Sequence, residues 1–469
     1  MHQSTKEKTN TYFLTFRVLP TEENEQYDMI EAALVHCWVV EDSPEDAISK
    51  ASFYVAKYDW IIKEIESYPT ETIREDFIEK DIGLQYYNKA QEDGIAIVFL
   101  AWSRDGKTTS GPKELKPLYN INTSNFLGAL KKYKNIGCCL HYDSDGNCKE
   151  IVNAHSIQRE RSLSAIAYDG HVYRIMADFG TLKKNKGKSL CQKVGINKVS
   201  TFLGFCKKHD NELFKKIDNY PLMPTDEQIF LYGYRSLCRE LFVKKNSLNI
   251  IENQLNNGQN QRAIKELLSN FKQKTAFGLK NLIRHKYRYD ESLKKKHYQN
   301  IEYVLFTSTQ KPFIAFSGLF YPDFDFMGEC LQDLGDHSTE LELIGFCSAP
   351  MITGWGFLFS WHASSSKVCV DFMRSLATMI CEDRKLEDML FRLVISNCEN
   401  HAISPQWWEC LSDIHQRQII ERASKMADVL VNTPQSYLTE GLEGIADWKF
   451  DSVISNMKIE PKKTNADDL

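Results

Sequence analysis

Two pairs of potential metal ligands, far apart in the sequence, most strongly constrain how this chain can fold. Cys139 and Cys148 flank residues 142–147, which are rich in turn formers, so a hairpin there would bring the two sulfurs together. Cys206 and His209 are three positions apart and would share one face of a helix over residues 204–214. Three thiolates and one imidazole form a suitable tetrahedral set for a structural zinc ion. The alternative is that these are reduced, buried cysteines without a metal.

The number and distribution of the cysteines indicate a reducing compartment. The 469 residues include 13 cysteines, an odd number spread along the chain, unlike the dense paired framework of small secreted domains. The polar N-terminus has no apolar signal-peptide core, and no stretch approaches the roughly 18 apolar residues that read as a membrane span. We therefore expect a cytosolic protein without a membrane association.

The net charge of −5 conceals an uneven distribution. Residues 1–112 carry 11 basic and 21 acidic side chains, and residues 301–469 carry 13 and 25. Residues 113–216 carry 19 basic and 9 acidic side chains, and residues 217–300 carry 15 and 8. The centre is therefore strongly basic between two acidic flanks. Such a centre suits contacts with nucleic-acid phosphates, or a solvated surface that docks on the acidic flanks.

Length and composition predict a multidomain α+β protein. With 42% hydrophobic and 26% charged residues the chain is not expected to be disordered, and its length allows about three domains. We predict an acidic α+β domain, a basic module, a helical connector and an acidic α+β C-terminal domain, over residues 1–112, 113–245, 246–300 and 301–469. The first domain is expected to have a regulatory or partner-binding role.

Residue periodicity predicts the elements of the N-terminal domain. Residues 11–19, 33–40 and 95–102 combine β-branched and aromatic residues and predict strands. Ser43 and Pro44 are typical of a helix cap and a first helical position, and we expect that helix to continue to about residue 65. These elements predict a small unit, for which a ferredoxin-like arrangement is one candidate.

The same reasoning covers the rest of the chain. Helices are predicted over residues 124–134, 225–245, 248–287 and about 406–432, and strands over residues 302–307 and 313–320. The Asn/Gln-rich run around Gly258 predicts a turn between helices. The cluster Asn397-Cys398-Glu399-Asn400-His401 has the residue types of a site. We assign it a capping or core role, because no second motif supports it.

His155 is the strongest candidate for a catalytic residue. It follows a short β-branched run at residues 150–152, where a strand would end, and it lies between the candidate metal ligands within the basic centre. An imidazole with a pKa near about 6.5 can accept a proton from water at neutral pH, as phosphodiester hydrolysis requires.

These residues resemble a known family. Their order along the chain is similar to that in the HNH, or His-Me finger, endonucleases. Here the order is Cys139, Cys148, Ala154-His155-Ser156-Ile157, Gly170-His171-Val172 and Phe205-Cys206-Lys207-Lys208-His209-Asp210. It is closest to the variety with an Ala-His-Ile-type motif and a helix in which a histidine is followed by Leu-Phe, here Leu213-Phe214. The resemblance covers about residues 136–218.

The resemblance implies a ββα-metal fold for the basic module, with a helical extension. It implies that His155 is the general base, that His209 binds a catalytic Mg²⁺ or Mn²⁺, and that Asp210 is a neighbour or substitute. His171 takes roughly the place of the family's central asparagine, either in that role or as a structural residue. Proteins with such modules often act in restriction or anti-phage defence.

Two departures from the family pattern leave alternatives open. Ala154 stands where the family often has a metal ligand, Asp or His. His209 cannot readily bind both a structural zinc ion and a catalytic ion. If zinc takes His209 with the three cysteines, the catalytic ion falls to Asp210 or to no residue, whereas Cys138 and His141 are spare ligands that could free His209.

Four lysines form a basic stretch between the predicted hairpin and the helix. Lys183, Lys184, Lys186 and Lys188 have no interleaved aromatic residues, which indicates contact with phosphates rather than base readout. A mobile solvated loop is the alternative. Either acidic domain could bind a protein partner.

The sequence therefore supports two hypotheses. The first is a metal-dependent HNH-like endonuclease, acting on DNA more than on RNA, with a structural Zn²⁺ and a catalytic Mg²⁺ or Mn²⁺. The second is a non-catalytic, zinc-stabilised nucleic-acid-binding or scaffold protein, motivated by Ala154 and by the missing clear asparagine.

Overall fold

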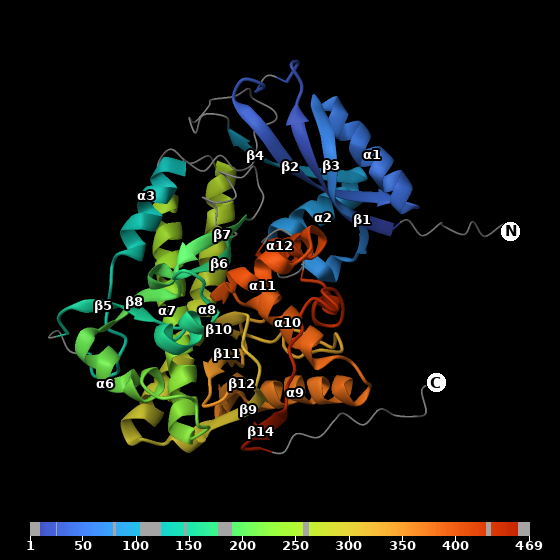
Figure 1. Cartoon of the computed structure of the whole chain (residues 1–469). Coiled ribbons are helices and arrows are strands. Elements are labelled where there is room, and N and C mark those ends of the chain that lie inside the picture. The colour runs from blue at the N-terminus through green and yellow to red at the C-terminus, as the bar shows by residue number, and fades with distance from the viewer. Residues whose placement is uncertain are drawn as a thin grey trace.

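The computed structural model describes residues 10–24, 26–77, 81–103, 123–144, 148–176, 190–256, 262–427 and 433–457. The fold mixes helices and strands in an N-terminal four-stranded sheet, a large eight-stranded sheet, a two-stranded pair and a set of long helices (Figure 1). Two predicted features lie outside the described residues. They are the basic stretch of Lys183, Lys184, Lys186 and Lys188, and the turn at Gly258. Within the described residues, no helix is both long and apolar enough to cross a membrane.

The N-terminal region is an antiparallel sheet with strand order β3-β1-β2-β4. Its strands are β1 (Asn10–Pro20), β2 (Ile30–Glu41), β3 (Trp60–Thr72) and β4 (Ile95–Ser103), and its helices are α1 (Pro44–Lys57) and α2 (Asp81–Asp93). Alternate residues of β1 point to opposite faces. Leu14 therefore packs in the cluster that contains Ala51 of α1, and Phe13 packs in the cluster that contains Ala90 of α2. Each face of the sheet is covered by one helix.

The three strands predicted for this region are confirmed, as is the cap at Ser43, whose hydroxyl accepts a hydrogen bond from the Asp46 amide. The prediction that α1 reaches residue 65 is wrong. The helix ends at Lys57, Asp59 adopts a left-handed φ of 62°, and the chain enters the edge strand β3. The ferredoxin-like candidate is also wrong, because the elements follow the order ββαβαβ instead of βαββαβ.

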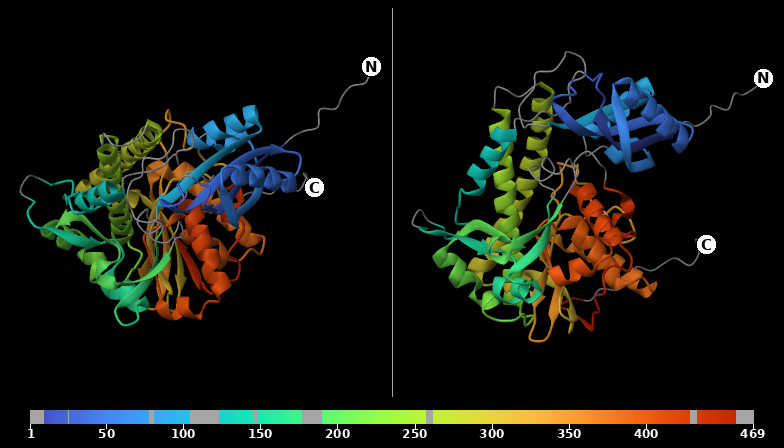
Figure 2. Two further views of the ribbon diagram at one scale, coloured as in Figure 1. Left: turned by 90° about the horizontal axis from the view of Figure 1, so that it is seen from above. Right: turned by 45° about the horizontal axis from the view of Figure 1, so that its top comes forward.

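The centre of the chain combines a two-stranded pair with long helices. Strand β5 (Ile151–His155) pairs antiparallel with β8 (Thr201–Cys206), and α6 (Lys207–Asp218) follows β8 directly. The other central helices are α3 (Thr123–Lys134), α7 (Asp226–Leu255) and α8 (Arg262–Lys295). Helices α7 and α8 lie side by side (Figure 2). The break predicted near residue 246 does not occur, since α7 continues to Leu255.

The eight-stranded sheet is antiparallel throughout, with strand order β14-β9-β12-β11-β10-β13-β6-β7. Its strands are β6 (His171–Met176), β7 (Leu190–Gly195), β9 (Ile301–Ser308), β10 (Ile314–Phe320), β11 (Ile344–Pro350), β12 (Trp355–His362), β13 (His401–Ile403) and β14 (Ser452–Ser455). The β6–β7 hairpin is inserted between β5 and β8 in the sequence. The sheet therefore joins the basic centre to the acidic C-terminal region.

Helices α9 (Ser366–Cys381), α10 (Leu386–Asn397), α11 (Pro405–Cys410) and α12 (Asp413–Ala427) complete the C-terminal region. The helical stretch predicted from residue 406 is thus divided into α11 and α12, and its last residues lie outside the described part of the chain. An aromatic core around Phe316, Trp355 and Trp448 fills the space between these helices and the sheet. Gly354 ends the turn before Trp355 with φ +71°, and a Cβ there would lie 1.9 Å from the Ser308 carbonyl oxygen, so only glycine fits.

A second core joins the two-stranded pair to the large sheet. Ala154 of β5, Phe205 of β8 and Phe214 of α6 share one buried cluster with Leu237 of α7 and Leu358 of β12. The elements that carry the candidate site are therefore packed directly on the C-terminal region.

Candidate functional site

Three cysteines and one histidine converge at the junction of the β5–β8 pair and α6. Cys139 lies in a segment that runs along β8, where the Cys138 amide donates to the Leu203 carbonyl at 3.0 Å and the Leu140 amide to the Gly204 carbonyl at 2.9 Å. Cys148 precedes β5, Cys206 ends β8, and His209 lies in the first turn of α6. The prediction that Cys139, Cys148, Cys206 and His209 come together is confirmed, since their ligand atoms all lie within 4.8 Å of one another.

The distances within this cluster suit a tetrahedral metal. The Nδ1 atom of His209 lies 3.3 Å from the sulfur of Cys139, 3.5 Å from that of Cys148 and 3.4 Å from that of Cys206. Around a tetrahedral zinc ion with Zn–S of about 2.3 Å and Zn–N of about 2.0 Å, ligand nitrogen and sulfur atoms are about 3.5 Å apart. The four residues therefore fit a structural metal ion such as zinc, and His209 directs its Nδ1 atom to that position.

The helix start prepares one of these thiols as a ligand. Cys206 is the N-cap of α6, and its sulfur accepts a hydrogen bond from the His209 amide at 3.5 Å. Burial acts to raise the pKa of Cys206, but this amide and the neighbouring thiols outweigh it and lower the pKa. For Cys148, burial and the hydrogen bonds with Cys139 and Cys206 raise the pKa to about 12. Without a cation the cluster therefore keeps protons that metal binding would displace.

The two spare ligand candidates lie beside the cluster and outside it. The His141 ring stacks on the His209 ring, with centroids 4.1 Å apart and an interplanar angle of 12°. Its Nδ1 atom accepts a hydrogen bond from the Asp143 amide at 3.2 Å. Burial, followed by the charges of His209 and Lys286, lowers the pKa of His141 to about 4. Neither His141 nor Cys138 belongs to the set that converges on one point, so nothing in the geometry frees His209 from the cysteines.

His155 ends β5 and is held by the residues that follow it. The Ser156 amide donates to the Ser200 carbonyl at 2.9 Å, and the Ile157 amide donates to the Ser200 hydroxyl at 2.8 Å. Ser200 has φ +61°, which turns its backbone toward this contact. The imidazole is half-buried. Burial and the positive charge of Arg159 lower the pKa of His155, and a hydrogen bond to the Ile196 backbone opposes them in part.

An ion pair between a buried arginine and a partly exposed aspartate lies beside His155, between α6 and α7. Arg235 donates from Nη1 to Oδ1 of Asp218 at 2.7 Å and from Nη2 to Oδ2 at 2.6 Å, and its guanidinium carbon lies 4.1 Å from the Phe214 ring centre. The charges of Arg235 and Asp218 act on both His155 and Asp210. Burial raises the pKa of Asp210, and Arg235 opposes this shift. His155, Asp210, Asp218 and Arg235 therefore form one electrostatic group.

Several shielded polar atoms of this group have no hydrogen-bond partner among the described residues. They are Nε2 of His155, Oδ1 of Asp210 and Nε of Arg235, together with Oε1 of Gln158 and the hydroxyl of Tyr232. Gln158 is fixed here because its Nε2 donates to the Asp218 carbonyl at 2.7 Å. Buried polar atoms are normally paired, and exceptions often mark sites of function. The unpartnered atoms therefore include a nitrogen base, one carboxylate oxygen and one guanidinium nitrogen, all shielded from solvent.

The remaining predicted residues occupy different places. His171 is exposed at the start of β6, where its Nδ1 atom lies 2.7 Å from the Asp169 carbonyl oxygen, and it belongs to the large sheet instead of the β5–β8 pair. Asp210 lies next to His209 on α6 but outside the Cys139, Cys148, Cys206 and His209 cluster.

Sequence reasoning missed Asp218 and Gln158, and it did not predict that Asp218 pairs with Arg235. Asp218 ends α6 and Arg235 lies on α7, so their pairing depends on how the two helices pack, for which neither residue carries a local signal. Gln158 lies three positions after His155, and no motif distinguishes it from a surface glutamine.

The Asn397 to His401 cluster is structural, as its assigned core role predicts. His401 is buried, its Nδ1 atom donates to the Cys398 carbonyl at 2.7 Å and its Nε2 atom accepts from the Ile175 amide at 3.3 Å. Asn400 reaches Ser156, the residue after His155, with a hydrogen bond of 2.9 Å. This cluster therefore links β6 and the end of β5 to the C-terminal region.

No protein-family model, curated protein or solved structure matches this chain. The function must therefore be argued from the site itself.

Proposed function

We propose that the protein is a metal-dependent, HNH-like endonuclease that hydrolyses phosphodiester bonds with His155 as the general base. The proposal is supported by the order β5, β8, α6, since a ββα-metal module would consist of two paired strands followed by a helix, and the β6–β7 hairpin would then be an insertion. His155 ends the first of these strands, and Asp210 lies in the helix.

The observation that carries the proposal is the state of the His155 ring. Its Nε2 atom has no hydrogen-bond partner among the described residues, while the ring also has a hydrogen bond to the Ile196 backbone. Such a bond on the other nitrogen fixes the tautomer in which Nε2 carries the lone pair. The lowered pKa keeps that lone pair available at neutral pH. His155 can then accept a proton from the water that attacks a phosphodiester.

Two different metals fit two different sets of residues. A structural Zn²⁺ would be held by Cys139, Cys148, Cys206 and His209. His209 would therefore not serve the catalytic Mg²⁺ or Mn²⁺, and Asp210 is the carboxylate that would hold that ion. A divalent ion there would stabilise negative charge that develops on the scissile phosphate. Asp218 is less suitable as a ligand, because both of its carboxylate oxygens accept hydrogen bonds from Arg235.

Nucleic acid, and DNA more than RNA, is the proposed substrate. Arg159 and Arg161 follow His155 on the exposed side of the module and would contact phosphates, as would Lys183, Lys184, Lys186 and Lys188. The acidic N-terminal and C-terminal regions would regulate the module or bind a protein partner. A cytosolic setting, consistent with thirteen free cysteines, and a role in restriction or anti-phage defence complete the proposal.

A specific observation favours a second function, that of a non-catalytic, zinc-stabilised binding or scaffold protein. Ala154 is buried and offers no ligand beside His155, and the cysteines engage His209, which leaves one carboxylate for a catalytic ion. This function requires nucleic-acid affinity that falls with salt, together with an absence of cleavage under any divalent ion.

A cleavage panel separates the two functions. Supercoiled plasmid, single-stranded DNA and RNA are incubated with the full-length protein in Mg²⁺, in Mn²⁺ and in chelator. The nuclease proposal requires divalent-dependent cleavage of at least one substrate. Salt-sensitive binding without cleavage in every condition would support the binding protein instead.

A further inference from the structure

The C-terminal end of α6 is held by side chains from two other parts of the chain. The last carbonyl groups of a helix have no partner within the helix, so they need hydrogen-bond donors from elsewhere. Here the donors include two glutamine amides. Gln158 reaches the end of α6 from the segment after β5, and Gln228 reaches it from the first turn of α7. Together with the Asp218–Arg235 ion pair they form what we call the α6 clamp.

Gln158 is held at both its side chain and its backbone. Its Nε2 atom donates to the carbonyl groups of Ile217 and Asp218, the last two residues of α6, at 2.7 Å in the case of Asp218. Gln158 is 4% exposed, so these bonds are stronger than they would be in water. Its backbone carbonyl accepts a hydrogen bond from the Leu163 amide at 3.0 Å. The clamp therefore reaches the chain directly after β5.

The other side of the clamp belongs to α7. The Nε2 atom of Gln228 donates to the carbonyl groups of Lys216 and Pro221, both at 3.0 Å. Arg235 donates to both carboxylate oxygens of Asp218. The end of α6 is thus bonded to α7 on one side and to the segment after β5 on the other.

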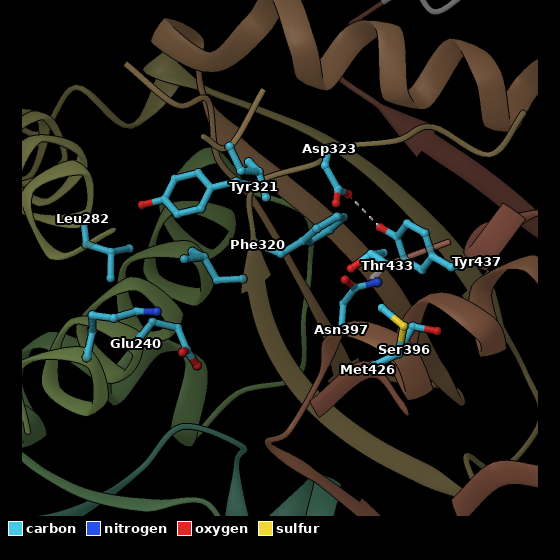
Figure 3. A pocket seen from close by; sticks show the side chains of 13 residues that line it. Glu240, Leu282, Phe320, Tyr321, Asp323, Ser396, Asn397, Met426, Thr433 and Tyr437 are labelled. Carbon is cyan, nitrogen blue, oxygen red and sulfur yellow. Dashed lines mark hydrogen bonds between the residues drawn. The ribbon is translucent and has the colours of Figure 1, made fainter. Parts of the chain in front are cut away.

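The clamp is separate from a cavity of about 320 Å³ that lies further along α7. Glu240 forms part of the lining of this cavity (Figure 3). Its lining includes neither Gln158 nor Gln228. Variants of the two glutamines therefore test the clamp without changing a wall of the cavity.

The clamp connects the segments that carry the two proposed catalytic groups. His155 lies three positions before Gln158, and Asp210 lies about two helical turns before Asp218 on α6. The residues between His155 and Gln158 are bonded to Ser200, just before β8, which fixes them against that strand. The bonds of Gln158 fix the same segment against α6.

We propose that Gln158 is a positioning residue, which fixes His155 relative to Asp210 by linking the segment after His155 to the end of α6. This inference rests on the proposed function of His155 and Asp210. A general base must lie within hydrogen-bond reach of the water whose proton it accepts, and a small displacement of the base slows the reaction strongly. Loss of the Gln158 bonds would loosen the segment and slow the chemical step, although Gln158 itself does not contact the substrate.

Gln158→Met and Gln228→Met are a matched pair of variants. Each replaces a buried amide with an apolar side chain of similar length and removes hydrogen bonds to the end of α6, but Gln158 lies on the His155 segment and Gln228 lies on α7. Thermal unfolding confirms that both full-length variants are folded and compares their stability with that of the wild type. An effect on His155 that Gln158→Met shows and Gln228→Met does not is therefore separate from a general loss of stability.

Hydrogen exchange measured by mass spectrometry tests the link without any need for nuclease activity. We expect backbone amides of residues 156–163 to exchange about tenfold faster in Gln158→Met than in the wild type, because local opening becomes easier. Gln228→Met should retain the wild-type exchange in this segment. Wild-type exchange in Gln158→Met would overturn the proposal.

Single-turnover cleavage over a range of substrate concentrations tests the effect on the chemical step. Gln158→Met should lower the maximal rate about tenfold, with the half-saturating substrate concentration within about twofold of the wild type. Gln228→Met should retain the wild-type rate. Equal rates in the two variants would overturn the positioning role. A wild type that cleaves no substrate would overturn the proposed function, whereas faster exchange in Gln158→Met would still support the link between the His155 segment and α6.

Discussion

Asn400 donates a hydrogen bond to the hydroxyl of Ser156 at 2.9 Å, although 244 positions separate the two residues. The same Asn400 amide group donates to the Ser317 carbonyl at 3.1 Å, and Asn400 is only 1% exposed. The Ser156 hydroxyl also lies 2.6 Å from that of Ser200. Because Ser156 directly follows His155, the C-terminal region holds the backbone that carries the proposed catalytic histidine.

Replacement of Asn400 should therefore destabilise the protein. Asn400→Ala removes two buried hydrogen bonds and leaves buried acceptors without this donor, at a cost of about 1 to 3 kcal/mol. Urea unfolding measures the change in the free energy of unfolding. Asn211→Ala, on the exposed face of α6, is the matched control and should change stability by less than about 0.5 kcal/mol. Equal stability of the two variants would show that the Asn400 bonds do not hold this junction together.

The cluster of three cysteines and His209 should bind one zinc ion per chain. Cys206→Ala removes a ligand that also caps α6, so we expect bound zinc to fall to near zero and stability to fall by at least about 3 kcal/mol. Mass spectrometry of the metal content and denaturant unfolding give the two values. Cys138→Ala is the matched control, because Cys138 is the neighbour of a ligand but lies outside the cluster. Loss of zinc in Cys138→Ala but not in Cys206→Ala would contradict the ligand assignment.

Stability should fall in mild acid because His401 is buried in its neutral form. Burial lowers the pKa of His401 from 6.5 to about 4. Below pH 6.5 the unfolded chain binds a proton at His401 that the folded chain excludes. The contribution of the neutral His401 to the free energy of unfolding is therefore complete above pH 6.5 and is lost as the pH falls toward 4. The difference between the pKa values in the unfolded and folded chain corresponds to on the order of 3 kcal/mol in the free energy of unfolding. Urea unfolding at pH 7 and pH 5 should show a larger loss for the wild type than for His401→Gln, which cannot take up this proton. An identical loss in both proteins would assign the acid sensitivity to other groups, such as the metal ligands.

Local patterns predicted much of this structure. The strands at β1, β2, β4, β9 and β10, the cap at Ser43 and the four cluster residues each have their signal within a short stretch of sequence. The cluster was predictable because three-residue spacing at a helix start and a turn-rich loop fix the geometry of each ligand pair almost independently of the rest of the chain.

Long-range contacts were not predictable in the same way. The β6–β7 hairpin joins the C-terminal sheet through a single pairing of Tyr173 with Ile403, and no property of either residue identifies the other as its partner. The Asn400–Ser156 contact is also long-range, and no property of either residue identifies the other as its partner. The residues after Lys57 misled the prediction because Ile61, Ile62 and Ile65 have the spacing of an amphipathic helix, although they belong to the edge strand β3. Tertiary packing decided between the two.

The proposed cleavage reaction should have an acid limb with its midpoint below pH 6.5. His155 must be unprotonated to act as a base, and burial together with the charge of Arg159 lowers its pKa below the ordinary value. Arg159→Gln removes a nearby positive charge and should move the midpoint toward higher pH. Single-turnover rates between pH 5 and pH 8 give the midpoint for each protein. A midpoint that Arg159→Gln leaves in place would indicate that another group controls the limb.

The most direct test of the central claim is the single-turnover cleavage rate of His155→Ala beside the wild type and His171→Ala, in the same Mg²⁺ or Mn²⁺ buffer. Zinc content and melting temperature are measured on each preparation to confirm that the module is intact. The account predicts that His155→Ala lowers the rate by at least about 100-fold, as expected for loss of a general base, with zinc unchanged. The exposed His171 lies on a different sheet, so His171→Ala should retain most of the rate. Cleavage at the wild-type rate by folded, zinc-bound His155→Ala would contradict the account.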